Sequence, residues 1–339
     1  MIPEEKLAAV TQALSETFGV TGFDDIRRLT RGNSTSRVFR IVVRGTPYLL
    51  KMVMRSDDAT RHFACMRAAA EAGLAPDVLY TSAPDKIAIT AYVETAPFHM
   101  ADALARMPAV LRSLHALPPF PGVPHHINTT CMFLMHEGPA RDGFLAMLRA
   151  GNVLSQADSQ EFLDRYAQLA AAYPHHAPEM VSSHNDLFKP DNILFDGRRV
   201  LLVDWEAAFL NDRYADLAAV ANMLVSNDEE ERAFLHEYLG RPPDEYELAR
   251  LFLMRQTAHI FYVMAFLLLG KSGPPLNLTE NRPDLHDFQQ RNWAGDVNLS
   301  EPGMKDLCGR VHWEHLLQDV RQPRFEEALR IVGGRRASA

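Results

Sequence analysis

The most informative stretch of the chain runs from Ser183 to Gly197 and reads SHNDLFKPDNILFDG. A second stretch follows closely, from Val200 to Glu206, and reads VLLVDWE. The first is a polar loop that leads into a short apolar strand, and the second is an apolar strand that ends on an acid. Because Asp-Gly favours the tight type I′ turn, we expect the two strands to form a hairpin across Asp196 and Gly197.

Such a hairpin would bring three polar side chains together. Asn192 precedes the first strand, Asp204 ends the second, and Asp186 lies in the same loop. Amide and carboxylate oxygens are ligands that Mg²⁺ takes, while phosphate and water fill its other positions. A further carboxylate can accept a proton from a hydroxyl nucleophile. The pattern therefore indicates phosphoryl transfer, which depends on positioning, a metal and a base.

The order of these residues also resembles a known family. His184-Asn-Asp186, then Asn192, then Asp204-Trp-Glu206 resembles the catalytic and metal-binding motifs of the choline kinase and aminoglycoside phosphotransferase families. These families are small-molecule relatives of the protein kinases, and the resemblance covers most of the chain. It implies a two-lobed, protein-kinase-like α+β fold with a small antiparallel-sheet N-lobe and a larger, mainly helical C-lobe.

The resemblance also implies a role for each residue. Asp186 would be the catalytic base, and Asn192 and Asp204 would hold Mg²⁺. Asp216, in a later segment that again resembles the superfamily, would brace the catalytic loop. His184 would be structural rather than an acid or a base.

The pattern of the rest of the chain agrees with two lobes, at 1–94 and 95–339. Helical spacing at 4–18 is followed mainly by strands, at 37–43, 48–54, 78–81 and 86–92, with one helix inserted at 57–72. After the boundary, helical patterns prevail, and a polar stretch rich in Pro and Asn predicts a long loop at 270–298. The helices are expected at about 100–117, 138–150, 159–172, 213–226, 229–239 and 244–269, with two more after Pro302.

In the N-lobe the resemblance implies a nucleotide site, with ATP and Mg²⁺ as cofactors. Lys51 would contact the α- and β-phosphates. The segment 31–36 has a single glycine, so its phosphate contacts would depend on the hydroxyls and amides of Ser34, Thr35 and Ser36. The adenine would be held by backbone hydrogen bonds of a hinge that begins at Tyr92 and includes Glu94.

Two features depart from the family pattern. Asn192 lies six steps after Asp186, where the usual spacing is five, so either Asp191 or Asn192 could be the metal ligand. The helix after the lysine normally offers a glutamate, but the corresponding residue here is His62, with Asp58 one turn earlier on the same face. Asp58 or a neutral, structural His62 could support Lys51, or this pair could be weakened.

The acceptor side is expected in the C-lobe. Trp205 and Glu206 could line the acceptor pocket, because an aromatic face and a carboxylate suit an ammonium group, or they could be packing residues. Asp212 and the loop at 270–298 would complete the pocket. Asn185 within HND, together with Asp-Trp-Glu, resembles the choline kinase side of the family.

The resemblance therefore implies a phosphotransferase that moves the γ-phosphate of ATP to a hydroxyl of a small molecule. A cationic acceptor like choline or ethanolamine is favoured, and an aminoglycoside, another antibiotic or a sugar is the alternative. A catalytically silent nucleotide-binding scaffold on the same fold remains a second hypothesis. A metal-dependent phosphohydrolase is a third, and it would need two metal ions about 4 Å apart.

Composition excludes several other classes. The 339 residues carry a net charge of −8, from 35 basic and 43 acidic residues, which argues against a general nucleic-acid-binding surface. The most apolar stretch, 260–269, is shorter than the roughly 20 residues that a membrane helix needs. The N-terminus lacks the features of a secretory signal, and the three cysteines form no CxxC pair. We expect a cytoplasmic protein with no membrane partner, and the sequence gives no oligomeric state.

Overall fold

The computed structural model describes residues 2–29, 36–54, 59–120, 146, 156–173, 180–268, 284–299, 301 and 303–336. Several expectations lie outside the described residues. They concern Ser34, Thr35, Asp58, most of the helix at 138–150 and the first part of the loop at 270–298.

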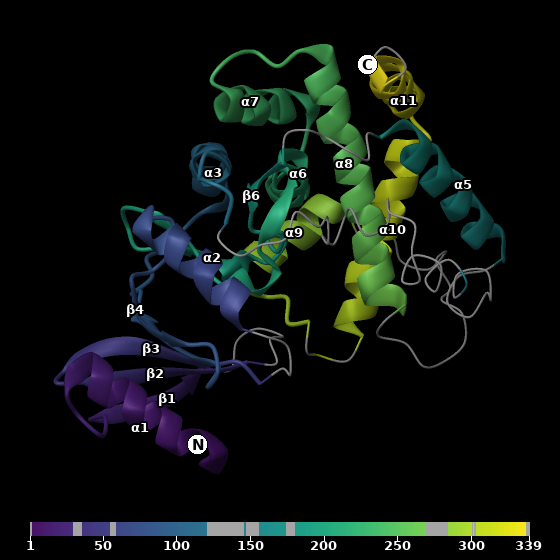
Figure 1. Cartoon of the computed structure of the whole chain (residues 1–339). Helices are drawn as coiled ribbons and strands as arrows, with labels where there is room; N and C mark the ends of the chain where they lie inside the picture. The colour runs from purple at the N-terminus through teal and green to yellow at the C-terminus, as the bar shows by residue number, and fades with distance from the viewer. Residues whose placement is uncertain are drawn as a thin grey trace.

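The N-terminal part is a five-stranded antiparallel sheet with the strand order β1-β2-β3-β5-β4. One helix, α1, packs on it at one end of the molecule (Figure 1). The bounds are α1 Glu4–Phe18, β1 Asp25–Leu29, β2 Arg37–Val43, β3 Thr46–Met52, β4 Val78–Ser82 and β5 Ile87–Ala91. The helix predicted at 4–18 is confirmed at both ends. Val10 and Leu14 lie one turn apart and form part of its buried face.

The sheet alternates between its two faces. In β3, Leu50 and Met52 are fully buried against α1, so Lys51 between them points to the opposite face. Beyond β3, helix α2 (Thr60–Glu71) lies between the sheet and the helical part of the molecule (Figure 1). Lys51 and α2 are therefore both directed toward the junction of the two parts.

The C-terminal part is mainly helical. Its central helix, α8, packs against α6, α10 and α11, while α3 packs against α6 and α7. The termini lie at opposite ends of the molecule (Figure 1). The bounds are α3 Met100–His115, α5 Gln156–Ala172, α6 Arg213–Leu224, α7 Asp228–Leu239, α8 Glu245–Val263, a π-helical turn η4 Met264–Leu268, α9 Leu285–Trp293, α10 Met304–Val320 and α11 Pro323–Arg336.

Helix α9 corrects the prediction of a loop throughout 270–298. The side chain of Asp284 accepts a hydrogen bond from the backbone N–H of Asp287 and so caps the helix. Leu285, Phe288 and Gln289 then form a buried face at helical spacing. The polar composition concealed a short amphipathic helix.

Two further pairs of short antiparallel strands follow in the C-terminal part. Strand β6 (Met180–Ser183) pairs with β9 (Phe209–Asp212), and β7 (Ile193–Phe195) pairs with β8 (Val200–Leu202), all antiparallel. The hairpin predicted from the sequence is thus confirmed.

The turn type predicted for that hairpin is wrong. Phe195 pairs with Val200, so four residues form the loop, and of the Asp-Gly pair only Gly197 has a positive φ, 90°. A type I′ turn requires positive φ at both central residues. Instead, the Asp196 carboxylate accepts hydrogen bonds from the backbone N–H groups of Arg198 and Arg199, at 2.8 and 2.6 Å.

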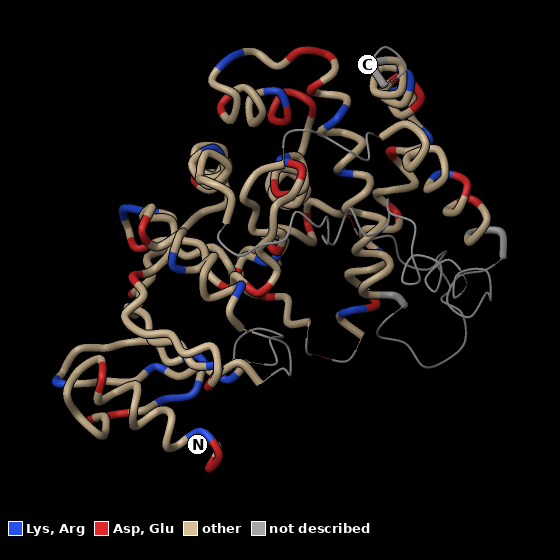
Figure 2. The backbone as a smooth tube through the Cα atoms, viewed as in Figure 1, with Lys and Arg blue, Asp and Glu red and all other residues tan. Residues whose placement is uncertain are grey.

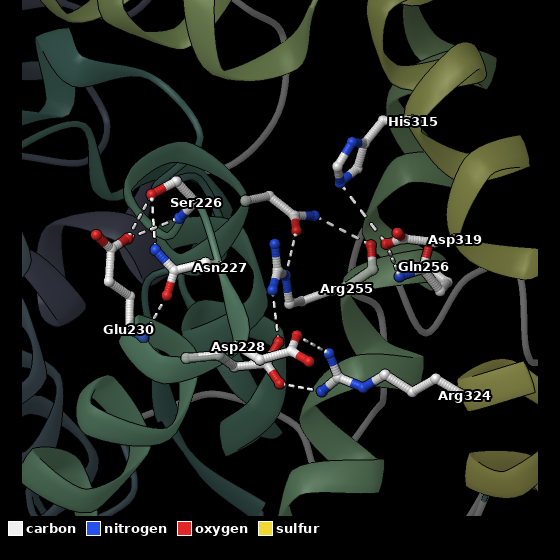
Figure 3. A network of polar contacts seen from close by, with 11 residues as sticks. Ser226, Asn227, Asp228, Glu230, Arg255, Gln256, His315, Asp319 and Arg324 are labelled. Atoms are coloured by element: carbon white, nitrogen blue, oxygen red, sulfur yellow. Dashed lines mark hydrogen bonds and ion pairs between the residues drawn. The ribbon is translucent and has the colours of Figure 1, made fainter. Parts of the chain in front are cut away.

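A buried polar network ties the C-terminal helices together (Figure 3). Glu231 of α7 is fully buried and is held by two guanidinium groups, Arg255 of α8 and Arg324 of α11. On the other side, Gln256 donates a hydrogen bond of 2.7 Å to Asp319 of α10. Side chains of α8 thus make polar contacts with α7 and α10, and Glu231 links α7 to α11 as well.

Charged residues of both signs are interspersed along the described chain, and acidic residues gather at the start of α7 (Figure 2). No helix among the described residues combines the length and the apolar character that crossing a membrane requires. The boundary that we propose between the lobes, after residue 94, falls between β5 and α3.

Candidate active site

The loop after β6 is closed by side-chain contacts of its own residues. The carboxylate of Asp186 accepts hydrogen bonds from Lys189 Nζ at 2.9 Å and from Asn192 Nδ2 at 3.0 Å. The same Asn192 amide group also donates to the backbone carbonyl of Asp186, at 2.7 Å. The Asp186 carboxylate is thereby fixed in orientation by an ammonium group and an amide.

Asn192, rather than Asp191, faces this carboxylate. Asn192 is buried at the end of a single 3₁₀ turn, η2 (Pro190–Asn192), while Asp191 is exposed. The backbone carbonyl of Asn192 accepts a hydrogen bond of 3.0 Å from the N–H of Val203. This contact continues the β7–β8 pairing and brings Asn192 next to Asp204.

Asp204 follows β8 in a left-handed backbone conformation, with φ 68° and ψ 61°. A non-glycine residue rarely adopts this conformation, and such residues gather at functional sites. Asp204 Oδ1 lies 2.7 Å from Nζ of Lys51, which reaches across from strand β3 of the sheet. The N-terminal sheet and the loop after β8 therefore meet at this ion pair.

Lys51 has a second carboxylate partner. Its Nζ lies 2.9 Å from Oε1 of Glu206, and the Ser36 hydroxyl donates a hydrogen bond of 2.8 Å to the same oxygen. Glu206 belongs to the 3₁₀ turn η3 (Trp205–Ala207), which directly follows Asp204. The question of what supports Lys51 thus has an answer that the sequence interpretation did not include.

These contacts set the charges of the site. Burial raises the pKa of Asp186 above its ordinary value, although the positive charge of Lys189 opposes this effect. Burial would also raise the pKa of Asp204, but the charge and hydrogen bond of Lys51 outweigh it and hold that pKa low. Burial would lower the pKa of Lys51, and Asp204 and Glu206 together raise it instead. Lys51 is therefore an ammonium and Asp204 a carboxylate near neutral pH.

Asp216 of α6 binds the main chain at the start of the loop that follows β6. Its fully buried carboxylate accepts hydrogen bonds from the backbone N–H groups of His184, at 2.8 Å, and Asn185, at 2.7 Å. Asn185 has a positive φ of 64°, so the two N–H groups point the same way around a sharp bend. The ring of His115 contacts the same carboxylate, at 3.3 Å.

His184 makes structural contacts. Its ring nitrogens contact the backbone carbonyl of Val203 at 2.9 Å and the backbone N–H of Asp186 at 3.3 Å. Its ring packs on Trp205, with centroids 4.6 Å apart. His184 is fully buried, and its contact with Val203 joins the start of the loop to the segment between β8 and Asp204.

None of the three residues considered for the acceptor pocket, Trp205, Glu206 and Asp212, lines the cavity described below, and Glu206 contacts Lys51 instead. Trp205 is 2% exposed, packs on Phe120 and donates its indole N–H to the carbonyl of Leu202. Asp212 is buried, caps α6 by accepting a hydrogen bond from the backbone N–H of Tyr214, and pairs with Arg250. The contacts of Trp205 match the packing alternative, and those of Asp212 are the contacts of a helix cap rather than of an acceptor pocket.

The remaining residues of the nucleotide side lie as follows. His62 is buried on α2, where its ring packs on Phe63 with centroids 4.5 Å apart. Tyr92 follows β5 and lies under the guanidinium group of Arg40, 5.2 Å from ring centroid to Cζ, and Glu94 is exposed in the extended connection to α3. A hinge function of this connection remains a proposal.

A cavity of about 380 Å³ opens beside the loop. Lys189 lines it and also contacts Asp186, so the cavity lies one side chain away from that carboxylate. Its wall combines aromatic rings with charged groups. They are Phe188, Tyr262, Phe266 and Phe288, and Lys189, Asp191, Asp296 and Glu301.

Sequence reasoning missed two residues of this site. Lys189 stands three residues after Asp186, and this short spacing in a polar loop was an available signal. Arg61 of α2 donates to the backbone carbonyls of Glu206, at 2.8 Å, and Ala208. Nothing local in the sequence could indicate that contact, because its partners lie far along the chain.

The oxygen donors of the site suit a Mg²⁺ ion that is bound together with substrate phosphates. Within the described part of the chain, no group of three or more His, Cys, Asp or Glu side chains is arranged to hold a metal ion. The site offers instead the carboxylates of Asp186 and Asp204 and the amide of Asn192. Mg²⁺ typically binds through one or two carboxylates together with substrate phosphates, rather than in an all-protein cage.

Comparison with known proteins defines the class. A model of the phosphotransferase enzyme family matches residues 25–252, more than half of the chain, so the chain belongs to this family. The family resemblance predicted from the sequence is confirmed, and so is membership of an enzyme family.

The similar solved structures include both choline/ethanolamine kinase family proteins and antibiotic phosphotransferases. The chain is similar in structure to a choline/ethanolamine kinase family protein from Mesorhizobium loti, with a TM-score of 0.62, 20% identity, and coverage of 97% of this chain and 99% of that one. It is also similar to a spectinomycin phosphotransferase solved with ADP and spectinomycin, with a TM-score of 0.58, 13% identity, and coverage of 93% and 98%. These likenesses confirm the two-lobed, protein-kinase-like α+β fold.

In sequence, the chain is similar to the LicA homolog of Mycoplasma capricolum subsp. capricolum. The two are 28% identical over 119 residues, which make up 35% of this chain and 47% of that protein. The match therefore spans about half the length of this curated relative.

Proposed function

We propose that the protein transfers the γ-phosphate of ATP, with Mg²⁺, to a hydroxyl of a small cationic amino alcohol. The observation that carries this proposal is the cavity lined by Lys189, the partner of Asp186, whose wall combines aromatic rings with acidic side chains. The phosphotransferase family supplies the reaction class. The cavity supplies the argument for the acceptor.

The residues of the loop have distinct parts in this reaction. Asp186 accepts the proton of the acceptor hydroxyl as the oxygen approaches the γ-phosphate, and Asn192 and Lys189 keep its carboxylate in place. Lys51 contacts the phosphates. Asp204 and Asn192 would hold Mg²⁺, which when bound neutralises charge on the phosphates.

The chemistry of the cavity favours an ammonium group. Aromatic faces attract cations, and four rings line the wall. Three carboxylates, from Asp191, Asp296 and Glu301, oppose one ammonium, from Lys189. His312 in the same wall adds no charge near neutral pH, because burial and His315 lower its pKa to about 3. An amino alcohol would place its ammonium among these groups and its hydroxyl toward Asp186.

An antibiotic acceptor is the second candidate. It is favoured by the likeness to the spectinomycin phosphotransferase. Its support is weaker, because that likeness is at 13% identity and concerns the fold alone. A silent scaffold is the third candidate, but the loop retains Asp186, Asn192 and Asp204 in contact with one another or with Lys51.

An acceptor panel tests the proposal. ADP release is measured with ATP and Mg²⁺ for choline, ethanolamine, spectinomycin, an aminoglycoside and a sugar. We expect acceptor-dependent turnover with a cationic amino alcohol, and its loss in Asp186→Asn. Asp196→Asn, in the exposed turn of the next hairpin, is the matched control and should keep its rate. Turnover with the antibiotics alone would overturn the acceptor class, and ATP binding without any turnover would favour the scaffold.

A further inference from the structure

The anchor of Lys51 comes from an unusual part of the fold. A partner for Lys51 was expected on the helix that follows it, at Asp58 or His62. The described residues of α2 contain one acid, Glu71, which is exposed at the last position of the helix. Lys51 is held instead by Asp204 and Glu206, which both belong to the loop after β8.

Glu206 is well placed for this task. Its side chain is 15% exposed, as is that of Lys51, so their contact is largely shielded from water. One oxygen, Oε1, accepts from both Lys51 Nζ, at 2.9 Å, and the Ser36 hydroxyl, at 2.8 Å. Ser36 directly precedes β2, at the end of the segment expected to contact phosphate. Glu206 therefore joins strand β3, the start of β2 and the turn η3.

Helix α2 contributes a cation in this region instead of an anion. The Arg61 guanidinium donates to the backbone carbonyls of Glu206 and Ala208, and its Cζ lies 3.8 Å from the centroid of the Phe209 ring. The helix thus binds the main chain of the turn that carries Glu206. Helix α2 therefore contacts the main chain of the turn, and the Glu206 side chain of that turn contacts Lys51.

The two carboxylates that contact Lys51, those of Asp204 and Glu206, have different roles in the proposed function. Asp204 is the residue that the proposed function assigns to Mg²⁺, so a bound ion would compete with Lys51 for its carboxylate. Glu206 stands two residues further on and contacts Lys51 through a separate carboxylate, to which the proposed function gives no metal. Glu206 would therefore remain as a partner of Lys51 when the metal is bound.

We propose that Glu206 positions Lys51 for the nucleotide phosphates, and that Arg61 docks helix α2 on the same turn. Glu206 acts through Lys51, so it is a positioning residue. This inference rests on the nucleotide role of Lys51 in the proposed function.

A double-mutant cycle on nucleotide binding tests it. The dissociation constant of ATP with Mg²⁺ is measured by calorimetry for the wild type, Glu206→Gln, Lys51→Met and the double variant. We expect Glu206→Gln to weaken binding about tenfold, which is within the range of couplings between contacting residues. In the Lys51→Met background the same change should have no further effect. A full, additive loss in that background, or unchanged binding in Glu206→Gln alone, would overturn the proposal.

Two further variants separate positioning from general damage. Glu71→Gln removes the one acid of the described part of α2 and should leave binding unchanged. Glu206→Asp keeps the charge on a shorter side chain, so its dissociation constant should fall between those of the wild type and Glu206→Gln. Equal losses in Glu206→Asp and Glu71→Gln would mean that the region merely tolerates substitution poorly, which contradicts the proposal.

A readout without nucleotide distinguishes this inference from the proposed function. The rate at which an amine-directed acylating reagent labels Lys51 is followed by mass spectrometry. Because Glu206 holds the Lys51 side chain in a contact that is largely shielded from water, Glu206→Gln should free the amine and label faster than the wild type, and Glu71→Gln should not. If the wild type binds no ATP, the proposed function fails, whereas unchanged labelling in Glu206→Gln defeats the positioning role itself.

Discussion

At the scale of single residues, the site depends on how burial and neighbouring charges compete at each carboxylate. Asp186 and Asp204 are both largely buried, yet the pKa of the first is raised and that of the second is lowered. The difference lies in their partners. The charge and hydrogen bond of Lys51 outweigh the effect of burial on Asp204, whereas Lys189 offsets only part of the effect of burial on Asp186. One acid suits proton transfer and the other suits metal binding.

Lys189 gives a prediction about pH. In the proposed function the ionised form of Asp186 is the base, so activity should be lost as pH falls through the pKa of Asp186. Because the charge of Lys189 lowers that pKa, Lys189→Met should raise it and move the acid limb of the kcat/KM profile to higher pH. Arg330→Met removes another cation paired at i,i+3, on the surface of α11, and should leave the profile unchanged. An acid limb that stays in place, or moves down, in Lys189→Met contradicts the role of Asp186 as base.

Asp216 gives a prediction about the loop. Its two carboxylate oxygens satisfy the N–H groups of His184 and Asn185. Asp216→Asn replaces one acceptor by a donor, so one buried N–H loses its partner, at a cost of about 1–3 kcal/mol in the free energy of unfolding. We expect a lower midpoint in urea denaturation and a reduced kcat. Asp164→Asn, on the exposed face of α5, is the control and should behave as the wild type. Unchanged stability and rate would show that the two N–H groups need no brace.

At the scale of elements, local patterns predicted much of the fold. Helix α1 follows from apolar residues at helical spacing, and β7 and β8 follow from short apolar runs around Asp196 and Gly197. What local patterns could not predict depends on distant partners. The turn type is set by the carboxylate of Asp196, and the anchoring role of Glu206 exists only because the chain returns to Lys51 from far along the sequence.

The cavity was likewise out of reach of the sequence. Tyr262 and Phe266 belong to an apolar stretch that reads as core, and they are indeed buried. They become pocket residues because Phe188, whose ring packs on both of theirs, and the segment after α9 line the same cavity. A hydrophobic period indicates which side of a helix is covered, but it does not indicate whether the covering leaves space for a ligand.

The polar network of Figure 3 gives a prediction about the packing of helices. Glu231→Gln leaves the guanidinium groups of Arg255 and Arg324 without their buried counter-charge. Breaking a buried ion pair by removing one partner typically costs about 3–5 kcal/mol in the free energy of unfolding. We expect a clear fall in Tm. Glu229→Gln, on the exposed side of the same helix, is the matched control. Equal Tm values for the two variants would mean that the network does not hold α7, α8 and α11 together.

At the scale of the whole molecule, the site belongs to neither part alone. Lys51 comes from the sheet, and its partners Asp204 and Glu206 come from the loop after β8. Arg61 of α2, the helix between the two parts, donates a hydrogen bond to the main chain of that loop. A ligand held by these groups must therefore contact both parts at once. Its binding energy should appear in the stability of the complete fold.

This yields a prediction about ligand-linked stability. A ligand that binds only the folded state at 100 times its Kd adds about 2.7 kcal/mol to the free energy of unfolding. For a chain of this size we expect ATP with Mg²⁺ to raise Tm by several degrees in one cooperative transition. Lys51→Met should lower Tm without ligand, because Asp204 and Glu206 lose their shared cation, and should also reduce the shift. Glu71→Gln should keep both values. A shift confined to one of two separate transitions, or a full shift in Lys51→Met, would place the nucleotide outside the junction of the two parts.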